Sequence, residues 1–149
     1  MRRILALALA LVLTRIATAQ SRAEYVGGTA EKLESGSSGS IEVSDEHFFA
    51  FYTKKGQVRV PYDRINLLEY GQKVDRRLLM AVVISPMFLL SKSRKHFLTI
   101  GYTDDDGNHQ ALVFRVDKND IRATLVSLEA RTGVKIEYQD DEARKARRG

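Results

Sequence analysis

The sequence predicts a mainly β fold with one C-terminal helix, of the α+β class. Three observations carry this prediction. Short stretches with alternating apolar and polar residues follow one another from Gln20 onward, turn-forming residues separate them, and the apolar spacing becomes helical only near residue 120. Strands followed by a single helix are typical of a bent antiparallel β sandwich or half barrel, which that helix caps. We expect the capping helix at about residues 118–132.

Composition limits the chemistry that the chain can perform. The chain has 149 residues, of which 44% are hydrophobic and 29% are charged, and it has no cysteine. This length is sufficient for one hydrophobic core. The absence of cysteine excludes disulfides, a thiolate nucleophile, and any metal site with cysteine ligands.

The first half of the chain contains most of the expected strands. The segment 34–40 is rich in serine and glycine and predicts a flexible loop. Gly27 and Gly28 interrupt the first strand and predict a bulge there. We expect strands at Tyr25–Leu33, Ile41–Val43, His47–Tyr52, Gln57–Pro61 and Ile65–Tyr70.

A hairpin and a helix follow in the second half. Lys95–Thr103 and His109–Asp117 read as two strands joined by the loop 104–108. Ile121, Leu125 and Leu128 then repeat at the i, i+4, i+7 spacing of one helix face.

The ends of this helix also carry signals. Asp117 is suited to the N-cap, and Gly133 is the expected left-handed stop. A strand is expected at Val134–Tyr138. The mixed-charge segment 139–149 is expected to be a disordered tail.

Residues 1–19 have the pattern of a cleavable signal peptide. Arg2 and Arg3 precede an apolar run from Ile4 to Leu13, and small residues at 17–19 suit a signal peptidase. An uncleaved anchor is the alternative, but ten apolar residues fall short of the roughly 20 that span a bilayer. We therefore expect Sec-type export to the periplasm, the cell envelope or the medium. Cleavage would remove three arginines and lower the net charge from +5 to +2.

An apolar insertion at 78–90 stands out from the rest of the chain. Its thirteen residues have Ser85 as their only polar side chain, and basic residues flank both ends. The candidate contacts to a membrane or partner are Leu78, Leu79, Met80, Val82, Val83, Ile84, Met87, Phe88, Leu89 and Leu90. The candidate contacts to an anionic surface are Arg76, Arg77, Lys92, Arg94 and Lys95.

Three interpretations of this insertion remain open at the level of sequence. It inserts into one membrane leaflet, it contacts a partner protein or a second copy of the chain, or it belongs to the core of its own domain. Burying five of its side chains is worth roughly 8 to 15 kcal/mol in gross transfer terms, so an exposed insertion is not expected.

Motifs for catalysis or metal binding are missing from the sequence. His47, His96 and His109 lack the spacing of metal ligands, and the Asp104–Asn108 loop lacks the ligand positions of a calcium loop. No nucleophile elbow or phosphate-binding loop occurs. We therefore expect no enzyme, no catalytic or metal residues and no cofactor. The basic end of the chain follows acidic residues and has no aromatic platform, so nucleic-acid binding is not expected either.

Residues 39–133, about two thirds of the chain, resemble the pleckstrin-homology-like (PH-like, GRAM-like) domains of small exported bacterial proteins. The resemblance rests on V-x-V-P-Y-x-x-I at Val58–Ile65, Y-T-D-x-x-G at Tyr102–Gly107 and L-E-x-x-T-G at Leu128–Gly133. It implies one PH-like domain over 20–138. Lipid-binding PH domains hold phosphates with basic residues in the first hairpin loop, whereas this chain has Gly-Ser-Ser-Gly there.

The expected function is that of a non-enzymatic binding module for a protein or a membrane surface, with homo-oligomers as a further option. The alternative is a small-ligand carrier or an enzyme that uses the end of the β barrel. That alternative predicts a polar, partly enclosed cavity with convergent ionisable groups.

Overall fold

The computed structural model describes residues 20–75, 77 and 95–148. The elements run in the order β1 (Gln20–Gly28), β2 (Ser37–Glu42), β3 (Phe48–Thr53), β4 (Gln57–Pro61), the short 3₁₀ helix η1 (Tyr62–Arg64), β5 (Ile65–Gly71), β6 (His96–Thr103), β7 (His109–Val116), α4 (Ile121–Thr132), β8 (Ile136–Tyr138) and α5 (Asp141–Arg148). The mainly β class with a helix near the C-terminus is confirmed.

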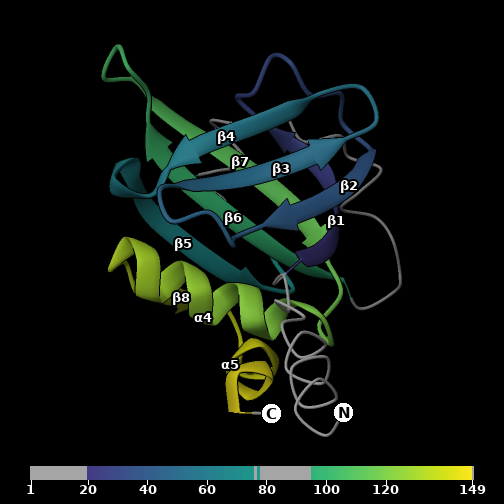
Figure 1. The fold of residues 1–149 in the computed structure, drawn as a ribbon. Coiled ribbons are helices and arrows are strands. Elements are labelled where there is room, and N and C mark those ends of the chain that lie inside the picture. Colours follow the sequence, from purple (N-terminus) through teal and green to yellow (C-terminus); the bar gives the residue numbers. More distant parts are fainter. Residues whose placement is uncertain (1–19, 76, 78–94, 149) are drawn as a thin grey trace, which may run out of the picture.

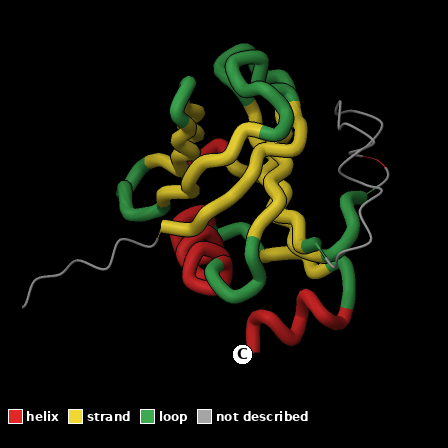
Figure 2. Tube along the Cα trace, turned by 90° about the vertical axis from the view of Figure 1, so that its right-hand side faces the viewer, coloured by secondary structure: helices red, strands yellow, loops and turns green. Residues whose placement is uncertain are grey.

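The strands form one sheet in the order β4-β3-β2-β1-β7-β6-β5-β8, and the sheet is not closed into a barrel. It bends strongly, so that β2, β3 and β4 cross in front of β5, β6 and β7 (Figure 1). Helix α4 lies across one end of this bent sheet (Figure 2). Every strand pairing is antiparallel except that of β5 with β8, which is parallel.

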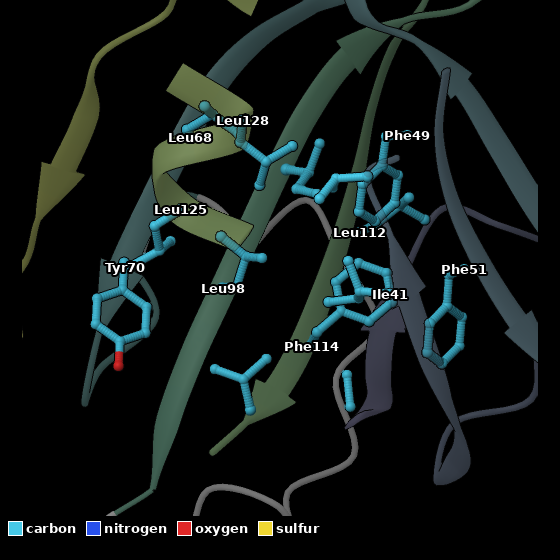
Figure 3. Close-up of a cluster of buried hydrophobic side chains, with 14 of the residues drawn as sticks. Ile41, Phe49, Phe51, Leu68, Tyr70, Leu98, Leu112, Phe114, Leu125 and Leu128 are labelled. Carbon is cyan, nitrogen blue, oxygen red and sulfur yellow. The ribbon is translucent and has the colours of Figure 1, made fainter. Parts of the chain in front are cut away.

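The main core lies between the two halves of the bent sheet and α4, and we call this side the inner face. Ile121, Leu125 and Leu128 of α4 are buried against it at the spacing that the sequence predicts. Phe114 of β7 lies near its centre, with ring centroids 5.9 Å from Phe49 and 4.8 Å from Phe51 (Figure 3). The two halves of the sheet therefore share one core.

The sequence predicts the C-terminal end of α4 correctly but not its N-terminal end. Gly133 adopts φ of 72° and its N–H donates to the Glu129 carbonyl at 3.0 Å, as expected for a left-handed stop. The expected start was wrong, because the N-cap residue is Asp120 rather than Asp117. Asp117 instead holds a turn ahead of the helix, with its carboxylate accepting from the Asn119 N–H at 2.8 Å.

The first two strands begin earlier than the sequence predicts. β1 covers Gln20–Gly28 rather than Tyr25–Leu33, and its register shifts between Tyr25 and Gly27, where a bulge was expected. β2 begins at Ser37, inside the expected flexible loop. Gly39 explains this difference, since a Cβ there would lie 2.1 Å from the Tyr52 carbonyl oxygen. The small residues allow β2 to pair closely with β3.

The C-terminal region also differs from the expectation. The tail that was expected to be disordered contains α5, which follows β8 (Figure 2). Asp140 explains this order, because its two carboxylate oxygens accept from the N–H of Ala143 and of Gln72, both at 2.7 Å. Ala143 is fully buried in the main core.

Two expectations concern residues outside the described ranges. These are the signal peptide at 1–19 and the apolar insertion at 78–90.

Candidate functional site

Only two of the expected contact residues lie in the described ranges. Arg77 is exposed, and its backbone N–H donates to the Asp75 carboxylate at 2.7 Å. Lys95 is half-buried and directly precedes β6. The remaining basic candidates, Arg76, Lys92 and Arg94, and all the apolar candidates from Leu78 to Leu90 lie outside these ranges.

Lys95 lines an open groove of about 500 Å³ at one end of the sheet, which we call the end groove. Arg22 and Arg115 line the same groove, although they are distant from Lys95 in the sequence. Glu24, Asp117 and Asp120 also line it, so acidic and basic residues balance. Arg115 forms an ion pair with Glu24. The end groove is therefore a mixed-charge surface rather than a cationic one.

A second open groove, of about 390 Å³, lies between the β1–β2 loop and the β3–β4 turn. Lys54, Lys55 and a run of small polar residues from Ser35 to Ser38 line it. The Lys55 ammonium lies 3.1 Å from the Glu34 carboxylate, and both side chains are exposed. This groove offers few groups for a phosphorylated headgroup, because one of its two lysines already has an anionic partner.

The outer face of β3 and β4 carries what we call the aromatic patch, formed by Phe48, Tyr52 and Arg59. Phe48 and Tyr52 alternate with the core residues of β3, and Arg59 lies on the paired strand opposite Ala50. The Arg59 guanidinium lies 4.5 Å from the centroid of the Phe48 ring. Tyr52 is 39% exposed, and with Val126 it is one of the two large hydrophobic side chains exposed among the described residues. Tyrosine, phenylalanine and arginine are enriched in protein interfaces.

Asp45 stabilises the turn that leads into β3 and this patch. Its carboxylate accepts from the backbone N–H of His47 at 2.8 Å and of Phe48 at 3.0 Å. These bonds lower the pKa of Asp45 below its ordinary value. The charged carboxylate lies 3.7 Å from the Arg59 guanidinium and so helps to position it over Phe48.

The patch borders β4, which is the last strand on its side of the described sheet. Backbone bonds pair Thr53 with Gly56 and His47 with Tyr62, which fixes the alternation of hydrogen bonds between β3 and β4. The backbone N–H groups of Gln57 and Arg59 consequently point away from β3. Pro61 has a carbonyl on this edge but no N–H.

The histidines are not brought together. His47 contacts Phe48, His96 stacks on Tyr70 with ring centroids 5.4 Å apart, and His109 is exposed at the start of β7. Asp104 accepts from the N–H groups of Asp106 and Asn108 and from the Gln110 side chain, and these bonds lower its pKa. The loop is thus held by its own hydrogen bonds. Among the described residues, no three His, Asp or Glu side chains are grouped as metal ligands.

Glu69 is an acidic side chain in an unusual environment. It is 6% exposed in β5, and its Oε2 has no hydrogen-bond partner within the described part of the chain. Burial raises the pKa of Glu69 from 4.5 to about 7, and the nearby Asp75 and Glu137 add to the rise. Glu69 is not among the lining residues of either groove described above.

The aromatic patch and the open edge of β4 in the described sheet are not among the features predicted from the sequence. The signal was present, because Phe48 and Tyr52 share parity in one expected strand and Arg59 lies in the next. An antiparallel pairing of these two strands is sufficient to place the three residues on one face. The end groove could not be found this way, since its residues come from β1, β2, β7, the residue before β6 and the turn before α4.

Comparison with protein-family models gave no match, and no curated protein matched the sequence. Within the described ranges, none of the helices has the length and apolar character needed to cross a bilayer.

Proposed function

We propose that this protein is an exported, non-enzymatic binding module of the PH-like kind that recognises an extended segment of a partner protein. Seven antiparallel strands followed by α4 agree with the architecture that the resemblance implies. The pattern of residues 1–19 supports export.

The observation that carries the proposal is the free edge of β4 beside the aromatic patch. An extended peptide adds a strand by bonding to outward-facing N–H and carbonyl groups, and side-chain contacts then supply specificity. Gln57 and Arg59 provide such groups, and Phe48 and Tyr52 lie on the adjacent outer face. Pro61 limits the paired region to a short peptide, because it has no N–H to donate.

The charge distribution favours a protein over an anionic membrane surface. A membrane of anionic lipids attracts clustered lysine and arginine. The end groove instead combines three basic residues with three acidic ones. The alternative of a carrier or enzyme predicts a partly enclosed cavity, whereas the two grooves described above are open to solvent.

The test is selection of short linear peptides from a phage-displayed library on the full chain, followed by affinity measurements on matched variants. Gln57→Pro removes one outward N–H without breaking a bond to β3, and Gln57→Ala retains that N–H. We expect Gln57→Pro to weaken binding about threefold to tenfold, the value of one backbone hydrogen bond, and Gln57→Ala to bind normally.

Backbone amide resonances provide the second readout. Bound peptides should shift the signals of Gln57 and Arg59 more than those of residues in either groove. Equal binding by both Gln57 variants, or shifts confined to the end groove, would show that the edge is not the site. If the wild-type chain and Gln57→Pro both sediment with anionic vesicles, the binding partner is a membrane surface rather than a peptide at the β4 edge.

A further inference from the structure

The outer face of β1, β7 and β6 carries apolar side chains that are withdrawn from solvent. Val26 and Val113 are fully buried there, and Phe97 and Ala111 are each 5% exposed. We call this group, together with Val74, the outer cluster. The contrast with the outer face of β3 is sharp, since Tyr52 is exposed there.

The register shows that the outer cluster is separate from the main core. Phe97 alternates with His96 and Leu98, while Ala111 and Val113 alternate with Leu112 and Phe114 of the main core. Thr99 and Glu69 pair across β6 and β5 on the same outer face, and both are buried.

The described helices do not account for this burial. The buried side chains of α4, Ile121, Thr124, Leu125 and Leu128, face the inner side, where all but Thr124 join the main core, and Ala143 of α5 also belongs to that core. Among the described residues outside the strands, only Val74 joins the outer cluster. A sheet face buried to this extent needs a covering layer.

Two stretches outside the described ranges have the length to provide this layer, namely 1–19 and 78–94. The chain enters β1 beside α4, because the Ser21 hydroxyl lies 2.7 Å from the Thr124 hydroxyl and donates to the Asp120 carbonyl. This places the junction with residues 1–19 next to the helix that covers the inner face.

The other stretch is connected to the outer cluster at both ends. Val74 belongs to the cluster and precedes Leu78 by four residues, and Phe97 of the cluster follows Lys95 by two. Residues 78–90 are also the one strongly apolar run between them. We propose that the outer cluster is the docking site for residues 78–90 of the same chain.

The docking implies that the apolar side chains of this insertion serve the protein's own fold. It concerns a different face from the free edge of β4, so either proposal can fail alone. If a membrane or a second copy of the chain covered the outer cluster instead, the protection of its side chains from solvent would depend on added vesicles or on protein concentration.

The natural absence of cysteine allows a clean test by thiol labelling. Ala111→Cys places a thiol in the outer cluster, and Ala130→Cys places one on the exposed side of α4 as a positive control. In the full chain without vesicles, we expect Ala111→Cys to react with a water-soluble maleimide about a hundredfold more slowly than Ala130→Cys, at every protein concentration.

Pairs of cysteines identify the covering segment. Ala111→Cys combined with Val82→Cys, Ser85→Cys or Met87→Cys should give an intrachain disulfide under mild oxidation in at least one pair. Rapid labelling of Ala111→Cys, or disulfides only between chains, would overturn the proposal. Thr99→Cys, at another buried outer position, replaces Ala111→Cys if circular dichroism shows that the latter does not fold.

Discussion

At the scale of single residues, Glu69 is a carboxyl group held where its charge is unfavourable. It lies on the outer face between Thr99 of β6 and Glu137 of β8, and burial raises its pKa from 4.5 to about 7. The folded protein therefore retains a proton that the unfolded chain releases between these two values. By linkage, the free energy of unfolding falls as the pH rises through this window.

We predict that wild-type protein loses about 3 kcal/mol of stability between pH 4.5 and pH 7 through this one group. Glu69→Gln removes the titration, so its stability should be less dependent on pH and should exceed that of the wild type above pH 7. Urea unfolding at a series of pH values measures both effects.

Glu137→Gln is the matched control for this experiment. Glu137 is exposed on β8 and pairs with Glu69, so removing its charge should lower the pKa of Glu69 slightly without abolishing the pH dependence. Parallel stability curves for Glu69→Gln and wild type would mean that Glu69 is charged in the folded protein at all these pH values.

At the scale of elements, the end of α4 depends on one backbone conformation. Gly133 has φ of 72°, and a Cβ at this position would meet no atom within 4 Å. A side chain at this position would therefore not clash with its neighbours. The free-energy cost of a substitution comes only from the left-handed backbone conformation.

Gly133→Ala should consequently destabilise the protein by about 1 kcal/mol, and Gly133→Asn by less, because asparagine tolerates the left-handed region. Thermal unfolding measures the difference. Gly39→Ala provides a contrast, since its Cβ would clash with the Tyr52 carbonyl and should cost considerably more. Equal losses at Gly133 for alanine and asparagine would contradict the conformational explanation.

The comparison of sequence with structure also belongs to this scale. Local signals located α4, its glycine stop and the hairpin of β6 and β7, because the periodicity of side chains and the turn residues determine these elements. The local signals did not reveal the start of β2 or the parallel pairing of β8, because contacts between residues distant in the sequence determine both. Ser37–Ser40 has low strand propensity but pairs with β1 along its length, and Gly39 and Ser40 also pair with β3.

The candidate site shows the same limit. The aromatic patch could be derived from two neighbouring strands, as their parity was visible in the sequence. The outer cluster could not be derived in this way, because its strand residues become neighbours only through the order β1-β7-β6. The insertion at 78–90 is visible in the sequence, whereas the sheet face that we propose as its docking site emerges only from the strand order.

At the scale of the whole molecule, Phe114 joins the two halves of the bent sheet. Its ring contacts Phe49 and Phe51 from one half and Tyr25 from β1, which belongs to both. A residue shared in this way couples the halves, so we expect them to unfold together.

Phe114→Ala should destabilise the protein by about 3 to 5 kcal/mol, a large part of the total stability of an ordinary domain. The unfolding transition should nevertheless remain single by fluorescence and by circular dichroism. Val126→Ala, at a position 55% exposed, should have little effect. Two separate transitions in Phe114→Ala would show that the halves are independent.

The pairing of β1 with β7 has a consequence for the timing of folding. Ala23 lies opposite Val116, so β1, the first described strand of the chain, pairs with a strand more than 80 residues later. Contacts of such long separation form slowly, because a long loop must close before any of them is gained. A nascent chain therefore cannot complete this sheet until β7 has emerged from the ribosome. That delay suits the export proposed above, because a narrow translocation channel passes only an extended chain.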